Sequence, residues 1–310
     1  RTMVLQGDTL WIGSLNGLYT YQLKSRQLNH FDSKQTGLPH NTIYSIIHTK
    51  DNQIYIGTYN GLCRYVQASG KFENILLPVN RGGSNLFVNS LLEDTTRQCI
   101  WIGMEGYLFQ YNPTIGEMKA IEVFHNNSIK SLALDGDENL LAGTDNGLYV
   151  YQNDKEPLQH IIHDSRNIQS LTNNIIWNIF SDQEHNIWLG TDYGISLSRY
   201  NSALQFVPIS QITGTGDGNQ FYSLFRDSKG FYWFGGTNGV IRFTHPAGNK
   251  HDAIWYRMGD KNHPLSHNRI RHIYEDREQQ LWIATDGSIN RYDYNTHQFV
   301  HYNIVDSTGT

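Results

Sequence analysis

Short apolar segments alternate with short polar segments along the whole chain, and one apolar pattern recurs at a regular spacing. Each copy begins with an aromatic or aliphatic residue and runs into a polar turn. The copies are WIGSLNGL (11–18), YIGTYNGL (55–62), WIGMEGYL (101–108), LAGTDNGL (141–148), WLGTDYGI (188–195), WFGGTNGV (233–240) and WIATDGSI (282–289). Their first residues lie 44, 46, 40, 47, 45 and 49 positions apart, a period typical of one four-stranded β-propeller blade.

Each copy predicts a strand before the aromatic position. In six copies an aspartate and a polar turn precede that position, which indicates a first strand joined to the second by a hairpin. In five copies the first strand opens with Asn and has apolar residues two and five positions later, so both of its faces are expected to be buried. These triplets are Asn41/Ile43/Ile46, Asn127/Ile129/Leu132, Asn174/Ile176/Ile179, Asn219/Phe221/Leu224 and Asn268/Ile270/Ile273.

A tight turn and two further strands complete each copy. Asn-Gly and Asp-Gly favour positive φ and therefore short hairpins, so the T-x-N-G pattern predicts a turn into a third strand. The third strands are expected to end on Tyr21, Tyr65, Tyr111, Tyr151, Tyr200, Phe243 and Tyr292. The fourth strands are marked by Phe31, Phe72, Met118, Ile161, Phe206, Trp255 and Phe299.

The period of the repeat separates a propeller from its alternatives. A β-sandwich need not repeat, and one coil of a β-solenoid is roughly half as long or shorter. We therefore predict an all-β fold, a seven-bladed β-propeller of four-stranded antiparallel blades, with residues 1–310 forming a single domain. Thr2 to Leu5 are expected to form the inner strand of the first blade. The alternative is a blade shared by strands from both chain ends.

Composition and charge narrow the classes of partner. The 28 Gly, 19 Tyr, 13 Phe and 7 Trp suit short aromatic strands joined by tight turns. The formal charge of −5 and the scattered basic residues argue against nucleic-acid binding. No apolar run approaches the roughly 20 residues that cross a bilayer, and the first residues lack the layout of a signal peptide, so we expect no membrane contact in this piece. Cys63 and Cys99 are expected to be buried free thiols.

The combined pattern resembles a known repeat. It reads N-x-I-x-x-I-x-x-D, then W-I-G-T-x-x-G-L-x-x-Y, then a strand with Phe, and over essentially the whole chain it resembles the two-component regulator propeller repeat. The resemblance implies the periplasmic sensor of a hybrid two-component histidine kinase and response regulator from glycan-foraging gut bacteria. It also implies neighbouring propeller and β-sandwich domains in a larger ectodomain, and a homodimer of the full-length protein. Leu86, Leu141 and Ala284 depart from the Asn, aromatic and Gly positions of the pattern.

Motifs that resemble metal or phosphate sites have simpler explanations. His263 and His267 stand four apart, but Pro264 and the strand that follows argue against a helical ligand pair. The glycines of residues 214–218 lead into a strand, whereas a phosphate-binding loop opens a helix. The acidic turn at residues 135–139 is shorter than an EF-hand loop. We therefore expect no metal and no cofactor.

Carboxylates in the tight turns are the remaining candidates for catalysis. Glu105, Asp145, Asp192 and Asp286 could converge as acid and base at a propeller mouth. Aspartate is also favoured in turns because its side chain hydrogen-bonds nearby backbone. Since the chain has no nucleophile motif either, we predict a domain without catalytic residues.

Two sets of polar residues follow the inner strands. The repeated Asn is expected to hydrogen-bond the adjoining loop backbone. The residues four positions later are expected to ring a central channel where water satisfies them. They are Ser45, Ser90, Ser131, Asn178, Ser223 and His272.

A ligand is expected on the face where two kinds of loop open together. These are the loop that leads into the inner strand and the turn between the second and third strands. Aromatic rings can stack on sugars there, while Arg and Asn supply directional hydrogen bonds or meet an acidic group. The predicted ligand-binding residues are His40, Tyr59, Arg81, Glu105, Tyr107, His125, Asn174, Asp192, Tyr193, Asn219, His267 and Arg269.

Three functions remain open from the residues alone. The leading hypothesis is a non-catalytic sensor propeller that responds to an oligosaccharide. The second is a propeller enzyme, either a polysaccharide lyase or a glycosidase, which would need a convergent acid and base. The third is a protein-interaction scaffold, which would need a flat apolar mouth.

Overall fold

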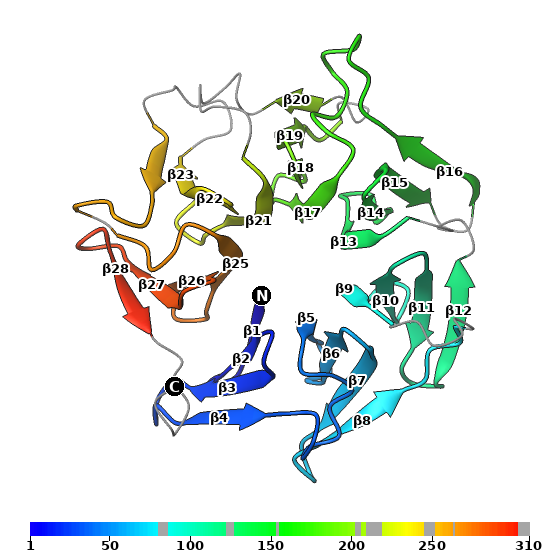
Figure 1. The fold of residues 1–310 in the computed structure, drawn as a ribbon. Coiled ribbons are helices and arrows are strands. Elements are labelled where there is room, and N and C mark those ends of the chain that lie inside the picture. The colour runs from blue at the N-terminus through cyan, green and yellow to red at the C-terminus, as the bar shows by residue number, and fades with distance from the viewer. Residues whose placement is uncertain are drawn as a thin grey trace. The chain divides into compact units, whose positions relative to one another are not determined.

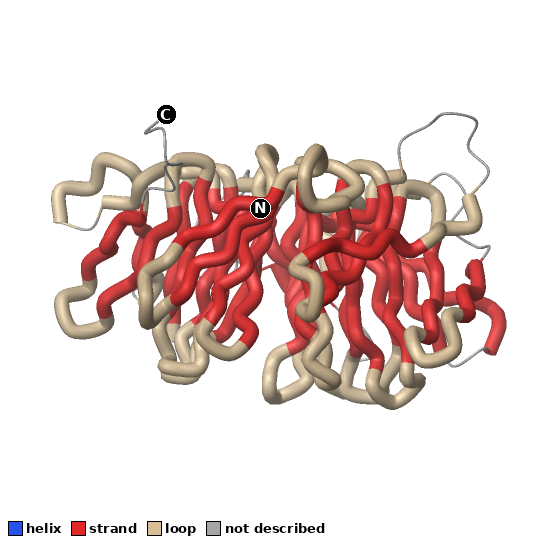
Figure 2. Tube along the Cα trace, turned by 90° about the horizontal axis from the view of Figure 1, so that it is seen from below, coloured by secondary structure: helices blue, strands red, loops and turns tan. Residues whose placement is uncertain are grey.

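The computed structural model describes residues 1–79, 86–121, 127–152, 155–201, 206–208, 219–244, 252–262 and 264–302. Figure 2 shows strands and loops in this part of the chain and no helix. The described strands form seven four-stranded sheets, in which hydrogen-bonded neighbours follow chain order. The fold is therefore a seven-bladed β-propeller of antiparallel blades, as the repeat period predicts.

The chain divides into two compact units, Arg1–Leu132 and Ala133–Thr310. Three complete blades lie in the first unit (Figure 1). Blade 1 consists of β1 (Thr2–Gln6), β2 (Thr9–Gly13), β3 (Leu18–Gln22) and β4 (Leu28–Phe31). Blade 2 consists of β5 (Ile43–His48), β6 (Ile54–Thr58), β7 (Gly61–Val66) and β8 (Lys71–Ile75). Blade 3 consists of β9 (Val88–Asp94), β10 (Cys99–Met104), β11 (Leu108–Asn112) and β12 (Glu117–Ile121).

The remaining blades belong mainly to the second unit. Blade 4 consists of β13 (Ile129–Leu134), β14 (Leu140–Thr144), β15 (Gly147–Gln152) and β16 (Lys155–Ile161). Blade 5 consists of β17 (Ile176–Ser181), β18 (Ile187–Thr191), β19 (Gly194–Ser198) and β20 (Phe206–Pro208). Blade 6 consists of β21 (Phe221–Arg226), β22 (Tyr232–Gly236), β23 (Gly239–Phe243) and β24 (Ile254–Tyr256). Blade 7 consists of β25 (Ile270–Glu275), β26 (Leu281–Thr285), β27 (Ile289–Asp293) and β28 (Gln298–Tyr302).

Two local expectations have different outcomes. The inner strand of blade 1 is the predicted stub, because β1 pairs with β2 in a continuous antiparallel register. The third strand of blade 5 was expected to reach Tyr200, and this is wrong because β19 ends at Ser198. Tyr200 lies in the turn after that strand, where its backbone N–H donates to Asn186 Oδ1 at 3.2 Å and its ring is 43% exposed.

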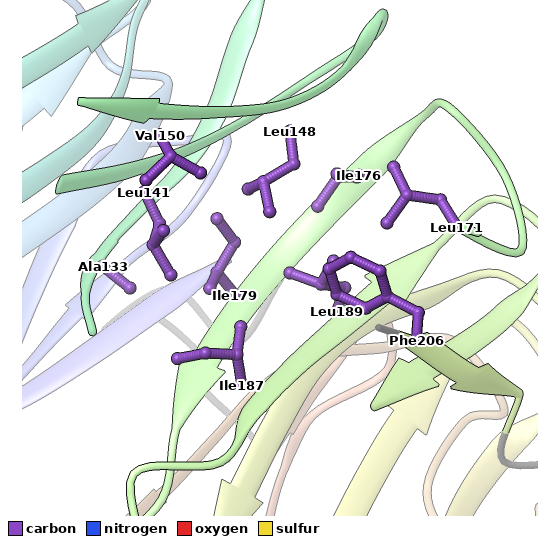
Figure 3. Packing of buried hydrophobic residues seen from close by; sticks show 10 residues of the cluster. All are labelled: Ala133, Leu141, Leu148, Val150, Leu171, Ile176, Ile179, Ile187, Leu189 and Phe206. Carbon is purple, nitrogen blue, oxygen red and sulfur yellow. The ribbon is translucent and has the colours of Figure 1, made fainter. Parts of the chain in front are cut away.

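The hydrophobic core of each unit lies between successive blades. Figure 3 shows one such cluster, in which Leu141 and Leu148 of blade 4 meet Ile176 and Leu189 of blade 5. Equivalent clusters join blades 1 and 2, 2 and 3, 5 and 6, and 6 and 7. Apolar residues on both faces of an inner strand are thus buried because each face packs against a different blade.

The tryptophans of the second strands are buried as predicted, and Trp11, Trp188 and Trp233 belong to these clusters. Trp101, Trp188 and Trp233 are fully buried, and Trp11 and Trp282 are 3% exposed. In four of these strands the preceding aspartate accepts a hydrogen bond from the indole N–H, whereas the indole of Trp11 donates to Gln6 Oε1 at 3.2 Å. The pairs are Trp101–Asp94 at 3.0 Å, Trp188–Asp182 at 2.8 Å, Trp233–Asp227 at 2.7 Å and Trp282–Asp276 at 2.8 Å. The repeated aspartate therefore satisfies the one polar atom of a buried tryptophan.

The repeated Asn has the predicted structural role. Its carbonyl accepts the N–H of the turn glycine in the preceding blade, as in Gly147 to Asn174 at 2.7 Å and Gly239 to Asn268 at 2.7 Å. Its side chain accepts a backbone N–H of the adjoining loop, from His163 at 2.6 Å in the case of Asn174. Each Asn thus links one blade to the turn of the blade before it.

The glycine of the W-I-G pattern makes room for the next blade. A Cβ built on Gly190 would lie 2.6 Å from the backbone oxygen of Phe221, and an overlap with backbone cannot be relieved by turning a side chain. Gly190→Ala is therefore expected to lower the free energy of unfolding by about 1–3 kcal/mol. Denaturant titration measures the loss. The control is Ala284→Gly at the equivalent position of blade 7, which should cost about 1 kcal/mol or less; a Gly190→Ala protein as stable as the parent would contradict this packing.

Candidate functional site

The inner strands of five blades each contain a β-bulge near their first residue. The register between the first and second strands skips one residue in each of these blades. The skipped residues are Tyr44, Asn89, Trp177, Tyr222 and Arg271. A bulge leaves the extra residue outside the ladder and turns its side chain in a new direction. These five side chains are accordingly half-buried, next to neighbours that are buried in the cores.

The bulges lie at the end of the blade where the second and third strands turn. The backbone N–H of Asp192, in that turn of blade 5, donates to the carbonyl of Ile175 at 2.9 Å. The N–H of Asp286, in the same turn of blade 7, donates to the carbonyl of Arg269 at 3.1 Å. In these two blades the start of the inner strand and the tight turn are therefore joined by a backbone hydrogen bond.

In the second unit this surface holds a continuous hydrogen-bonded network, which we call the blade 5–7 network. Asp192 Oδ1 accepts the Trp177 indole N–H at 3.0 Å and the Gln220 amide N–H at 2.6 Å. The Tyr222 hydroxyl donates to Gln220 Oε1. The rings of Trp177 and Tyr222 meet edge to face, with centroids 5.4 Å apart. Two aromatic side chains from adjacent blades are thus fixed by one carboxylate and one amide.

Two arginines extend the network into blade 7. Arg269 Nη2 lies 3.4 Å from the Tyr222 hydroxyl, and its guanidinium carbon lies 5.8 Å from the ring centroid of that tyrosine. Arg271 forms a two-pronged ion pair with Asp286, with Nε–Oδ1 at 2.6 Å and Nη2–Oδ2 at 3.0 Å. The members of the network are Trp177, Asp192, Gln220, Tyr222, Arg269, Arg271 and Asp286.

The charges in blade 7 affect one another. Partial burial acts to raise the pKa of Asp286, but the hydrogen bond and charge of Arg271 hold that pKa below its ordinary value, with help from Arg269 and His267. The hydrogen bond to Tyr222 raises the pKa of Arg269. Asp286 and Arg269 therefore stay ionised at neutral pH.

A second group of rings lies on the first unit. Tyr59 lies 4.8 Å from the ring centroid of His40, 6.5 Å from that of Tyr44 and 4.4 Å from that of Phe87. The guanidinium of Arg1 lies over Tyr44 at 4.9 Å. All four rings are half-buried. The inner-strand start and the tight turn thus bring aromatic side chains together in this unit as well.

The structure brings some of the predicted ligand-binding residues together. Asp192 and Arg269 belong to the blade 5–7 network, and His40 and Tyr59 share the aromatic group of the first unit. His267 lies beside Arg269, since its Nδ1 accepts the backbone N–H of that residue at 3.0 Å. His40 makes the same bond to Thr42, so both histidines also brace their loops.

Other predicted residues lie elsewhere or have structural partners. Asn174 and Asn219 support the loops and turns, and Asn219 Oδ1 accepts the Thr237 hydroxyl at 2.6 Å. Glu105 forms a backbone bridge with Ser128, and Tyr107 stacks on Phe109. Three predicted residues remain. Tyr193 is 52% exposed, while Arg81 and His125 are outside the described residues, as are His263 and residues 214–218.

Three of the residues expected to ring a water-filled channel accept hydrogen bonds from a neighbouring inner strand. Ser90 Oγ accepts the Leu132 N–H at 3.1 Å, and Ser223 Oγ accepts the Ile273 N–H at 2.9 Å. Asn178 Oδ1 accepts the Leu224 N–H at 3.3 Å. The inner strand is the edge strand of its sheet, so amides on its open side have no partner in that sheet and pair with these side chains.

Five network members were absent from the predicted ligand-binding set: Trp177, Gln220, Tyr222, Arg271 and Asp286. Asp286 was considered only as a turn carboxylate. The signal in the sequence is the position three residues after the repeated Asn, which holds Trp177, Tyr222 and Arg271. This position lies between an apolar residue and a polar one. Strict alternation would place its side chain on a packed face of the strand, and the bulge turns that side chain away from this face.

The described residues offer few other candidates. A cavity of about 320 Å³ lies between blades 4 and 5 at the opposite end of the strands, and its lining includes Val150, Ile187, Asp137, His185 and Tyr200. The described part of the chain holds no group of three His, Cys, Asp or Glu side chains placed for a metal. It also holds no helix long and apolar enough to cross a bilayer.

Comparison with known proteins identifies the family. Residues 37–60, 170–193, 215–238 and 264–287 match the family model described as a two component regulator propeller. The chain belongs to the two-component regulator propeller family. No curated protein matches it.

Crystal structures of one close relative cover this regulator propeller completely. The extracellular domain of the proposed hybrid two-component system BT4673 from B. thetaiotaomicron is 82% identical over 100% of the chain, with a TM-score of 0.64. A second structure of that extracellular domain, described as a proposed one-component system, is 82% identical over 99% of the chain, also with a TM-score of 0.64. The regulator propeller spans 42% of the length of either relative.

Distant structures share the fold alone. PorZ, a surface component of the type-IX secretion system of Porphyromonas gingivalis, is 14% identical with a TM-score of 0.75, covering 95% of this chain and 46% of PorZ. Virginiamycin B lyase from Staphylococcus aureus is 12% identical with a TM-score of 0.64, covering 86% of this chain and 85% of the lyase. Since sensors and enzymes both use such propellers, the function must be argued from the site.

Proposed function

We propose that this chain is a ligand-binding propeller in the periplasmic sensor domain of a hybrid two-component system, and that its ligand is an oligosaccharide. The observation that carries the first part is the 82% identity, over the whole chain, to an extracellular domain of that class. Neighbouring domains in the same polypeptide belong to this proposal because the relatives extend well beyond the chain. A homodimer of the full-length protein belongs to it as an implication of the family resemblance alone.

The chemistry of the blade 5–7 network supports an oligosaccharide. Trp177 and Tyr222 offer half-buried ring surface, and Gln220 and Arg269 offer planar hydrogen-bonding groups beside it. Sugars present apolar C–H faces edged by hydroxyl groups, so a binding site needs apolar surface and directional polar groups together. The hydrogen bonds that hold these side chains in place also lower the ordering cost of binding.

The proposal includes no catalysis by this domain. Asp286 is held in a two-pronged ion pair with a lowered pKa, which suits an acceptor and does not suit a general acid. Asp192 is engaged by two neutral donors. The two carboxylates therefore have fixed structural partners in place of the opposed acid and base that glycoside cleavage requires.

Binding is tested on the intact extracellular domain by calorimetric titration with a panel of oligosaccharides. For a ligand that binds, Trp177→Ala and Tyr222→Ala are each expected to weaken the affinity about ten- to a hundredfold, because each removes a fixed aromatic contact. Tyr200→Ala is the control: it removes an exposed ring at the opposite end of the same unit and should leave the affinity within about twofold. Unchanged affinity in both network variants would place the ligand elsewhere.

A further inference from the structure

We infer that the blade 5–7 network selects uncharged oligosaccharides over acidic ones, and that Asp192 is the residue that determines this specificity. The inference rests on the proposed function, since it assumes that the network binds a sugar. The class of sugar is inferred from the charged groups of the network that have no described ion-pair partner.

Asp192 and Asp286 have different electrostatic partners. Asp286 is neutralised by Arg271 through two short hydrogen bonds. Asp192 forms no ion pair with a described lysine or arginine, and its two side-chain donors, Trp177 and Gln220, are both neutral. No described cation is therefore paired with the half-buried carboxylate of Asp192 next to the aromatic pair.

The free atoms of Asp192 define what it can accept. Both described donors reach Oδ1, so Oδ2 accepts no hydrogen bond from a described residue. An ionised carboxylate is an acceptor only. Its free oxygen can take hydrogen bonds from the hydroxyl groups of a sugar, whereas the carboxylate of a uronic acid or a sulfate ester would bring a second negative charge against it.

Arg269, at the other end of the network, does not reverse the preference for neutral sugars. Arg269 supplies donors beside Tyr222, but the network as a whole contains two aspartates and two arginines and carries no net charge. Sites that bind anions are usually built with an excess of cations or backbone N–H groups. Arg269 is therefore assigned to the acceptor oxygens of a neutral sugar, with Asp192 accepting from its hydroxyl groups.

The test compares sugars of different charge on the intact extracellular domain. The probes are neutral hexose and pentose oligosaccharides of two to eight sugars, and oligogalacturonides whose carboxyl groups are either free or methyl-esterified. The wild-type protein is expected to bind a neutral probe at least about tenfold more tightly than any free-acid probe. Esterification isolates the effect of charge, because it masks the carboxylate on an unchanged sugar backbone.

Asp192→Asn is the decisive variant. The amide retains an oxygen that can accept from Trp177 and Gln220, so the network is expected to survive while its negative charge is lost. The ratio of neutral to acidic affinity is expected to fall by about tenfold or more. Asp137→Asn is the matched control, since it removes the same charge from an exposed turn at the opposite end of the same unit, and this ratio should stay within about twofold.

Two kinds of result would contradict these proposals. Wild-type protein that prefers free acids, or a ratio unchanged by Asp192→Asn, overturns this inference and leaves the sensor proposal standing. An intact extracellular domain that binds no oligosaccharide of either charge overturns the proposed function, and this inference with it.

Discussion

Replacing Trp188 by alanine is expected to lower the free energy of unfolding by roughly 3–5 kcal/mol. The indole is fully buried, and its ring contacts Tyr232 and Phe234 of blade 6 with centroids 4.9 and 5.2 Å away. The substitution leaves a cavity between two blades and removes the N–H that Asp182 accepts at 2.8 Å. Denaturant titration of the purified chain measures the change.

Trp177→Ala is the matched control for this prediction. Trp177 lies in the same blade, but it is half-buried at the bulge and belongs to no core cluster. We expect it to cost about 1 kcal/mol or less in stability, although it carries the larger effect on binding. Equal losses of stability in the two variants would show that Trp188 does not have the core role assigned to it.

Asp227→Ala is expected to cost about 3–5 kcal/mol. The carboxylate is 2% exposed and accepts from the Trp233 indole at 2.7 Å and the Tyr294 hydroxyl at 2.6 Å. It also accepts the backbone N–H groups of Lys229 and Phe231. Alanine would leave all four donors without this acceptor, two of them from large side chains in a core.

Asp135→Ala in blade 4 provides the comparison. Asp135 occupies the equivalent turn and accepts from Asp137 and Asn139. The second strand of this blade has Leu141 where four other blades have a tryptophan bonded to their aspartate, so no indole depends on Asp135. We expect a loss of about 1 kcal/mol from its turn alone. Thermal or denaturant unfolding of the two variants thus separates the contribution of the turn to stability from that of the buried hydrogen bonds. A loss of stability of similar size in both variants would contradict the role given to Trp233 and Tyr294.

The parts of the fold that repeat could be predicted from the sequence. The number of blades and the burial of Trp188 follow from local patterns that recur seven times, and the role of Asn174 follows from the position of one residue type at each turn. The end of the third strand in blade 5 could not be predicted from its tyrosine, because the strand stops two residues before Tyr200 and a side chain of another turn, Asn186, holds the chain there.

The candidate site was only partly predictable because it depends on departures from regular register. Asp192 and Arg269 could be selected from their loops, although 77 residues separate them in the sequence. Nothing in the pattern shows that Gln220 and Tyr222 connect them, since those contacts arise only when three blades pack together. A bulge also has no signature in hydrophobic alternation beyond the residue that it displaces.

The bulge also separates the residue that packs between blades from the residue that faces a ligand, two requirements that usually compete in a protein. In blades 2, 3, 5, 6 and 7 the bulged position holds Tyr, Asn, Trp, Tyr and Arg, while the residue before it is always apolar and buried. A mutation there changes what the surface offers to a ligand and leaves the buried apolar residue before it in place. Descendants of such a propeller can therefore diverge in what they recognise, one blade at a time, without first having to acquire spare stability.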